Sequence, residues 1–209
     1  MPYLIPMPTR PATADRNHLR KQLRLKRRQL PPGDRLACAR QLTQHLRHER
    51  LVLNSRHIAV YLPADGEIDT WPLIEWLWSL GKITYLPVLV PFSDQRLWFS
   101  SFARDDTLVY NRFGILEPER VHYRRIRTSA LDLVLTPLVA FDASGHRLGM
   151  GGGYYDHSFR FLKQRQYLCK PVLLGLAYEF QRTPRISPQP WDIPLDAVAT
   201  EYRVYHCTR

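Results

Sequence analysis

The chain has 209 residues, of which 44% are hydrophobic, and a formal net charge of +11 at pH 7. This composition provides one sizeable core and excludes a largely disordered chain. No apolar stretch approaches the roughly 20 residues needed to cross a membrane, and the three cysteines are too scattered for a disulfide framework or a zinc site. We therefore expect a soluble, cytoplasmic protein that attracts anions such as nucleic acid, phosphorylated small molecules or polycarboxylates.

The N-terminal part predicts a flexible tail followed by helices. Residues 1–14 contain four prolines and precede a single expected domain over residues 15–209. Residues 15–30 place leucines on one helical stripe and arginines 16, 20, 24 and 27 on the adjacent stripe. The basic stripe therefore borders the buried face of this helix.

A second helix is expected directly after the first. Pro31-Pro32 ends the first helix, and Asp34 is the expected N-cap of an amphipathic helix that continues to about Arg50. Together the two helices would form a helical hairpin at the N-terminus.

The next segment predicts a β-α-β unit. Residues 57–62 form a strand, a helix begins near Thr70 and is closed by Gly81, and residues 83–86 form a second strand. Short links favour a right-handed crossover between parallel strands. We expect the three tryptophans of this helix to pack against the core rather than to stack on nucleic-acid bases.

The second half continues the alternation of strands and helices. We expect a turn at a pocket rim over residues 113–118 and a helix over residues 154–164. The apolar run 131–139 is typical of a buried parallel strand that leads to a glycine-rich loop. Further strands are expected over residues 97–102, 171–177 and 197–205. The pattern predicts a three-layer α/β fold with ligand sites at the carboxyl ends of the strands.

The most informative segment is 147–156, RLGMGGGYYD. Its four glycines, at positions 149, 151, 152 and 153, let backbone N–H groups approach an anion without obstruction by side chains. Arg147 adds a positive charge, the expected helix start adds unpaired N–H groups, and Asp156 could hold the Mg²⁺ that accompanies a nucleoside triphosphate. The segment therefore predicts a polyphosphate site, although a flexible glycine turn with solvated charges stays open.

Two common nucleotide motifs do not explain this segment. The Walker pattern needs a Lys after the last glycine, and the dinucleotide fingerprint needs a glycine at position 154, which is Tyr. The loop is therefore not one of these generic nucleotide motifs.

Several separated motifs resemble the 5-formyltetrahydrofolate cyclo-ligase family, and the resemblance covers nearly the whole chain after the tail. It implies a Rossmann-like fold with a mostly parallel central sheet. It also implies conversion of 5-formyltetrahydrofolate into 5,10-methenyltetrahydrofolate with ATP and Mg²⁺, with release of ADP and phosphate. The motifs are RKQLRLKRR (20–28), VYLPADGEIDT (60–70), GKITYLPVL (81–89), FGILEPE (113–119), the segment 132–156 and WDIPLDAVATE (191–201).

The resemblance also implies roles for individual residues. Glu67, Arg147 and Tyr154 would be catalytic, with Glu67 at the N10 region of the folate. Glu67, Phe113 and Tyr154 would bind the folate substrate. Asp156 and Asp192 would hold the metal. ATP would be bound by Arg20, Arg24, Arg147, Gly149, Met150, Gly151, Gly152, Gly153, Tyr154, Tyr155 and Asp156.

One departure from the family pattern concerns Arg20, because the family commonly has Lys at this position. Arg binds phosphate in a bidentate geometry where Lys acts as a point charge, so Arg24 is the firmer of the two assignments.

The resemblance accounts for the positive charge without a nucleic acid or a membrane, since ATP and the folate glutamate tail are both anions. It leaves open whether that tail carries one glutamate or several, and we expect a monomer. Two other interpretations remain. The arginine-rich helix and tryptophans are compatible with a nucleic-acid-binding module, and the fold class is compatible with an enzyme acting on sugar phosphates or CoA esters.

Overall fold

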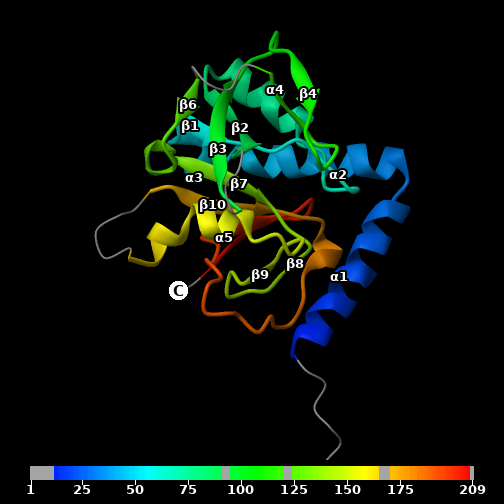
Figure 1. Cartoon of the computed structure of the whole chain (residues 1–209). Helices are drawn as coiled ribbons and strands as arrows, with labels where there is room; N and C mark the ends of the chain where they lie inside the picture. The colour runs from blue at the N-terminus through cyan, green and yellow to red at the C-terminus, as the bar shows by residue number, and fades with distance from the viewer. Residues whose placement is uncertain (1–11, 91–94, 120–123, 165–169, 208–209) are drawn as a thin grey trace, which may run out of the picture.

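The computed structural model describes residues 12–90, 95–119, 124–164 and 170–207 (Figure 1). The helices are α1 (Ala12–Gln29), α2 (Pro32–Leu46), α3 (Arg50–Leu53), α4 (Trp71–Ser79) and α5 (Tyr154–Ser158), with 3₁₀ turns η1 (Thr128–Ala130), η2 (Arg160–Gln164) and η3 (Glu179–Gln181). The strands are β1 (His57–Ala59), β2 (Ile83–Leu89), β3 (Leu97–Phe102), β4 (Leu108–Tyr110), β5 (Leu116–Pro118), β6 (Arg125–Ile126), β7 (Leu133–Pro137), β8 (Ala140–Phe141), β9 (Arg147–Leu148), β10 (Val172–Leu176), β11 (Ala197–Ala199) and β12 (Val204–His206).

The central sheet has eight strands in the order β12-β11-β10-β7-β1-β2-β3-β6. The strands from β11 to β2 are parallel to their neighbours, whereas β12, β3 and β6 pair antiparallel at the two sides. This confirms the mostly parallel sheet and the β1-α4-β2 unit that the sequence predicts.

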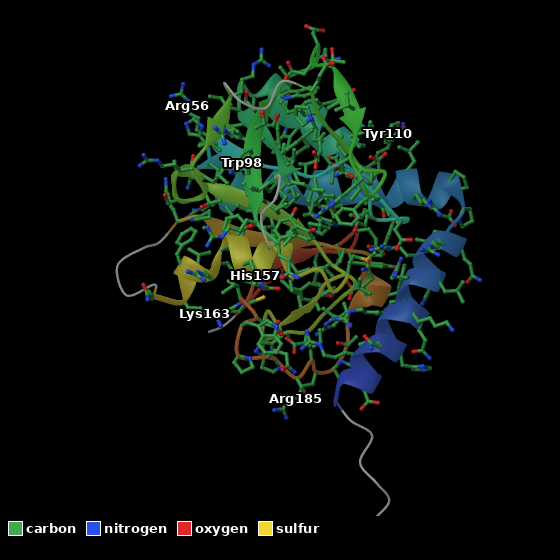
Figure 2. All side chains as sticks on the ribbon, viewed as in Figure 1. Arg56, Trp98, Tyr110, His157, Lys163 and Arg185 are labelled. Carbon is green, nitrogen blue, oxygen red and sulfur yellow. The ribbon has the colours of Figure 1, made fainter. Side chains whose placement is uncertain are left out.

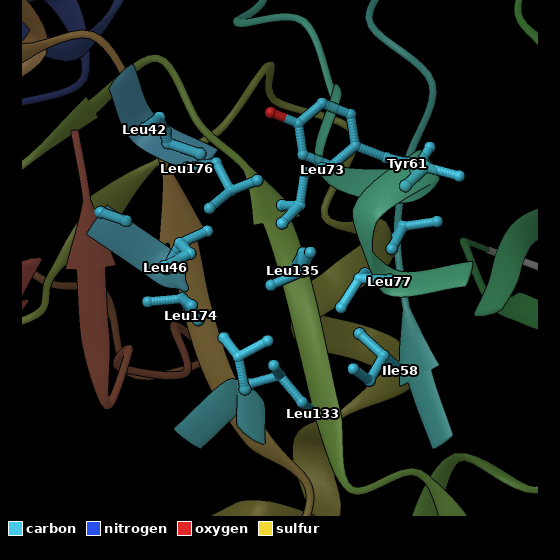
Figure 3. Close-up of a cluster of buried hydrophobic side chains, with 14 of the residues drawn as sticks. Leu42, Leu46, Ile58, Tyr61, Leu73, Leu77, Leu133, Leu135, Leu174 and Leu176 are labelled. Carbon is cyan, nitrogen blue, oxygen red and sulfur yellow. The ribbon is translucent and has the colours of Figure 1, made fainter. Parts of the chain in front are cut away.

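Two hydrophobic clusters cover the two faces of the sheet and make the fold three-layered. On one face, α2 and α4 pack against alternate sheet residues, including Leu133 and Leu135 (Figure 3). On the other face, Val134 packs with Phe159 and Leu162, which follow α5. Alternate residues of β7 thus face opposite layers, and its leucines and valine are buried on both sides.

The N-terminal helices differ in detail from the prediction. Helix α1 already begins at Ala12, inside the expected tail, while residues 1–11 of that tail lie outside the described residues. Pro31, not Asp34, is the N-cap of α2, because Pro32 takes the first helical position, where its missing N–H costs nothing. Helix α2 ends at Leu46. The helical hairpin is not confirmed: α1 contacts β8, whereas α2 packs on α4 and β11.

Two predicted elements of the second half are divided, and a hairpin separates a third from the glycines. The expected helix 154–164 is the five-residue α5 followed by η2, and the expected strand 197–205 is the antiparallel pair β11 and β12. The strand β7 does not lead directly to the glycines, because the hairpin of β8 and β9 lies between them. The last strand before the glycines is therefore β9.

The segments that follow β1 and β7 meet at the point where the order of the strands changes direction. Strands β1 and β7 are parallel neighbours, yet the chain continues from β1 to β2 on one side and from β7 to β10 on the other. Such a switch leaves a crevice at the carboxyl ends of the two strands. The segment after β1 carries Glu67, and the segment after β7 leads to the glycines, so both reach this edge.

No described helix combines the length and the apolar character that a membrane crossing requires. Cys38 and Cys207 are free thiols, and Cys169 lies outside the described residues.

Candidate functional site

Glu67 is an almost buried carboxyl group in the segment between β1 and α4. Its side chain is 10% exposed, accepts a hydrogen bond from the Ala64 N–H at 3.1 Å, and lies 3.7 Å from the Arg27 guanidinium. Burial raises the pKa of Glu67 to about 7, although the positive charge of Arg27 acts in the opposite direction. Glu67 can therefore take up or release a proton near neutral pH.

Two tyrosines interact electrostatically with Glu67. Burial raises the pKa of both Tyr61 and Tyr155. The Tyr61 hydroxyl is buried and has no hydrogen-bond partner among the described residues. Because an unsatisfied buried hydroxyl costs about 1–3 kcal/mol, this position fits a polar group of a bound ligand.

The loop that carries Glu67 is attached to α1 through Asp65. The Asp65 carboxylate accepts hydrogen bonds from Arg24 at 2.7 Å and Arg27 at 2.9 Å, and it also pairs with Arg28. Burial acts to raise the pKa of Asp65, but these hydrogen bonds and charges outweigh it and lower the pKa. Arg27 is 1% exposed and also donates to the Leu138 carbonyl at 3.3 Å, so α1 is connected to the segments after both β1 and β7.

The glycine loop, residues 149–153, connects β9 to α5. Gly151 and Gly153 have φ values of +107° and +69°, which residues with side chains rarely adopt. No atom lies within 4 Å of a Cβ placed on Gly149 or Gly151, whereas a Cβ on Gly152 would meet the Tyr154 ring at 2.9 Å. The backbone at Gly149 and Gly151 is therefore accessible to a ligand, which fits the expected anion site.

A cavity of about 600 Å³ lies between α1 and the glycine loop, and we call it the glycine-loop cavity. Its lining residues include four cations and no carboxylate, a composition that suits a phosphate group. Arg20 also donates to the Gly149 carbonyl at 2.9 Å and so contacts the loop directly. The lining residues are Asn17, Arg20, Lys21, Arg24, Leu25, Arg28, Met150 and Gly151.

Arg147 lies inside the protein and does not line the glycine-loop cavity. Its side chain is 5% exposed and donates to Asp156 at 2.6 Å and to the Ile193 carbonyl. Asp156 also accepts a hydrogen bond from the Ile193 N–H at 3.0 Å. The pair therefore connects β9 and α5 to the C-terminal segment, and direct contact between Arg147 and phosphate stays a prediction.

The two acids assigned to a metal lie near one another in this C-terminal connection. Asp192 precedes Ile193, which is bonded to Asp156, and Asp192 also pairs with Arg16 of α1 at 3.2 Å. Among the described residues, no group of three or more His, Cys, Asp or Glu side chains could hold a metal ion. In this structure Asp156 accepts from Arg147 and Asp192 from Arg16, so the binding of Mg²⁺ by these two carboxylates stays a prediction.

Tyr154 and Phe113 form an aromatic rim. Their rings meet edge to face at 6.1 Å, the Arg112 guanidinium donates to the Tyr154 hydroxyl at 3.2 Å, and it lies 5.0 Å from the centre of the Phe113 ring. Phe113 is 55% exposed, so its ring is free to contact a planar ligand. Tyr155, the neighbour of Tyr154, instead packs inward, with its ring stacked against Phe159 at 6.3 Å.

The structure adds residues to the site that the sequence did not identify. Arg27 was one of the stripe of arginines on α1, but nothing in the sequence set it apart from Arg24 as the buried member. Asp65 lies in the family motif over residues 60–70, and its position two residues before Glu67 was the only sequence signal for a role in the site. Tyr61 lies in the same motif, but no role was assigned to it, because an aromatic residue near a strand end is common. Arg112 carries no sequence signal, because an isolated arginine is common.

Comparisons with known proteins identify the family of the chain. A model of the 5-formyltetrahydrofolate cyclo-ligase family matches residues 12–201. The chain is 41% identical over 183 residues to the 5-formyltetrahydrofolate cyclo-ligase of Escherichia coli K12, covering 88% of this chain and 98% of the relative. It is 29% identical over 188 residues to the mouse (Mus musculus) cyclo-ligase, covering 88% and 92%.

The fold has a counterpart among solved structures. The NMR structure of Aquifex aeolicus 5,10-methenyltetrahydrofolate synthetase matches with a TM-score of 0.77 at 29% identity and covers 93% of both chains. The chain therefore belongs to the 5-formyltetrahydrofolate cyclo-ligase family.

Proposed function

We propose that the protein uses ATP to convert 5-formyltetrahydrofolate into 5,10-methenyltetrahydrofolate, with release of ADP and phosphate. The observation that carries this proposal is the meeting of two different subsites at one edge of the sheet. Glu67 provides a proton-exchanging carboxyl group, and the glycine-loop cavity provides an open, positively charged place for phosphate. Arg27 hydrogen-bonds the loop of one subsite and lies 3.9 Å from the Met150 sulfur in the other.

The chemistry explains why both subsites are needed. The N5-formyl group is an amide, whose oxygen is a poor leaving group. The formyl oxygen attacks the γ-phosphorus of ATP and ADP leaves; N10 then attacks the activated formyl carbon and closes the ring, and the oxygen departs with phosphate. An ionised Glu67 takes the proton that N10 loses. Positioning and charge neutralisation suffice, so no protein nucleophile is required.

The remaining residues are assigned to ATP, metal and folate. The ATP phosphates would lie against Arg20, Arg24 and residues 149–153. Asp156 and Asp192 would hold Mg²⁺, which supplies positive charge next to the phosphate oxygens. Phe113 and Tyr154 would contact the folate, while Arg147 would keep Asp156 in place.

A direct assay tests the proposal. Purified protein is mixed with 5-formyltetrahydrofolate, and the absorbance of the methenyl product is followed with ATP and Mg²⁺ and with each omitted in turn. We expect product only in the complete mixture, with one phosphate released per methenyl group formed. A correctly folded protein that forms no methenyl product in the complete mixture would exclude the function.

The distribution of charge gives the nucleic-acid alternative little support. Exposed basic residues such as Arg56, Lys163 and Arg185 lie on separate parts of the surface (Figure 2), whereas the four cations gathered on α1 line the glycine-loop cavity that we assign to phosphate. A nucleic-acid-binding protein would instead bind RNA with an affinity that falls steeply with salt. We expect no such binding, and we expect a monomer in size-exclusion chromatography.

A further inference from the structure

Three arginines of α1 bind the same Asp65 carboxylate, but they differ in burial. The Arg24 and Arg28 side chains are 34% and 56% exposed, whereas that of Arg27 is 1% exposed. Arg27 is also the one that lies within 4 Å of a second carboxylate among the described residues, with 3.7 Å between its Nη1 and Oε1 of Glu67. It is thus placed between Asp65 and the acid of the proposed reaction.

The surroundings fix the position of Arg27 closely. Its Nε donates to the Asp65 carbonyl at 2.9 Å, its Nη2 to the Asp65 carboxylate at 2.9 Å, and its Nη1 to the Leu138 carbonyl at 3.3 Å. With hydrogen bonds from all three nitrogens, the guanidinium has little freedom to turn away from Glu67. Gly66 adds to this contact, because a Cβ there would meet the Arg27 carbonyl oxygen at 3.0 Å.

The charges around Glu67 oppose one another. Arg27 and Arg24 favour its ionised form, whereas burial and the negative charge of Asp65 disfavour it. Two tyrosines, Tyr61 and Tyr155, also face Glu67 electrostatically, and the Tyr178 hydroxyl donates to its backbone carbonyl at 3.4 Å. Neither tyrosine gives up its proton near neutral pH, so the charged groups that act on the protonation of Glu67, beside its burial, are the arginines and Asp65.

We propose that Arg27, oriented by Asp65, is a positioning residue that holds Glu67 in place and keeps its carboxylate ionised when N10 loses its proton. This inference rests on the proposed function, since it gives Glu67 the role of base. Asp65 has two effects: it orients Arg27 through hydrogen bonds, and its negative charge offsets part of the Arg27 charge. Asp65 thereby limits how far Arg27 lowers the pKa of Glu67.

Substitutions of Arg27 and of Asp65 should therefore shift the pKa of Glu67 in opposite directions. Arg27→Met removes the positive charge but keeps a long side chain, and we expect the pKa of Glu67 to rise by about one to three units. Asp65→Asn removes the negative charge and keeps the shape, and we expect the pKa to fall by roughly half a unit or more. Asn suits this position because Asp65 has a φ of +51°, which Asn tolerates.

The experiment follows the ¹³C resonance of the Glu67 carboxyl group by NMR across pH in the full-length protein, with Glu67→Gln identifying the signal. This titration needs no turnover, so it separates the inference from the proposed function. Arg28→Gln is the matched control: Arg28 also binds Asp65 but does not approach Glu67, so the Glu67 midpoint should stay unchanged. Shifts of the same sign in Arg27→Met and Asp65→Asn, or no shift, would overturn the inference.

A second measurement compares the pH dependence of kcat. As pH rises, kcat should increase with the ionisation of Glu67, and the pH at half-maximal kcat is the midpoint. This midpoint should move upward in Arg27→Met and downward in Asp65→Asn. Arg27→Lys should keep it closer to the wild-type value because the charge is retained. A purely structural role would lower kcat without moving the midpoint. If Arg27→Met does not fold, the Asp65→Asn variant alone tests the proposal. An unchanged or raised Glu67 midpoint in that variant contradicts it. A wild type that makes no product but shows the predicted NMR shifts would refute the function and leave the electrostatic coupling standing.

Discussion

Replacing Arg147 by Met tests whether this arginine has a structural partner inside the protein. The change keeps a long apolar side chain but removes the charge that faces Asp156 at 2.6 Å. Removing one partner of a buried ion pair usually costs about 3–5 kcal/mol. Because the Asp156 side chain is 19% exposed and keeps the Ile193 N–H bond, we expect the lower end, about 3 kcal/mol. For a chain of this size, this loss corresponds to a Tm lower by about 6–12 °C.

Urea unfolding at pH 7 measures this effect, and a double-mutant cycle with Asp156→Asn assigns it to the pair. The double variant should be at least about 1 kcal/mol more stable than the two single losses added together. Arg56→Met is the matched control, because Arg56 is exposed, and its free energy of unfolding should stay within about 0.5 kcal/mol of wild type. A loss below about 1 kcal/mol for Arg147→Met, or simple additivity, would refute the internal pairing of Arg147.

The remaining predictions concern the other parts of the site. Gly149→Ala meets no atom within 4 Å, so it should keep the free energy of unfolding while raising the KM for ATP about tenfold or more. Gly33→Ala, in the first turn of α2, is the control and should leave this KM unchanged; an unchanged KM in Gly149→Ala would show that phosphate does not approach Gly149. Glu67 has a pKa raised from 4.5 to about 7, so its stabilising contribution is present at low pH and is lost as pH rises through 7. Between pH 5 and 8 the wild type should therefore lose about 2.5 kcal/mol more stability than Glu67→Gln in urea titrations, and equal losses would contradict the raised pKa. Phe113→Ala should raise the KM for the folate but not for ATP, with no change in Tm, because the ring is 55% exposed; an equal effect on both substrates would remove Phe113 from the folate rim.

Local patterns predicted the parts of the fold that depend on local physics. The apolar runs of β1, β2 and β7, the closing Gly81 of α4 and the open glycine loop all follow from burial and backbone freedom of single residues. Short elements without a pattern were not predicted. The two-residue strands β8 and β9 lie between β7 and the glycines, and no periodicity can be read from two residues.

The site shows a different limit, because charged residues look the same in a sequence whichever partner they face. Arg147 beside four glycines suggested phosphate, but its guanidinium is directed at Asp156. The helical spacing of arginines on α1 correctly placed them beside the buried face, yet it could not show that Arg27 reaches Asp65, 38 residues away. Burial of that arginine depends on how α1 lies across the sheet edge, which only the tertiary structure defines.

The fate of the formyl oxygen tests the proposed function most directly. 5-Formyltetrahydrofolate labelled with ¹⁸O in the formyl group is converted in a single turnover with unlabelled ATP in unlabelled water, and the released phosphate is analysed by mass spectrometry. Attack of the formyl oxygen on the γ-phosphorus predicts one ¹⁸O atom in each phosphate released. Unlabelled phosphate, with the ¹⁸O found in water instead, would contradict the mechanism to which we assign the glycine loop and Glu67.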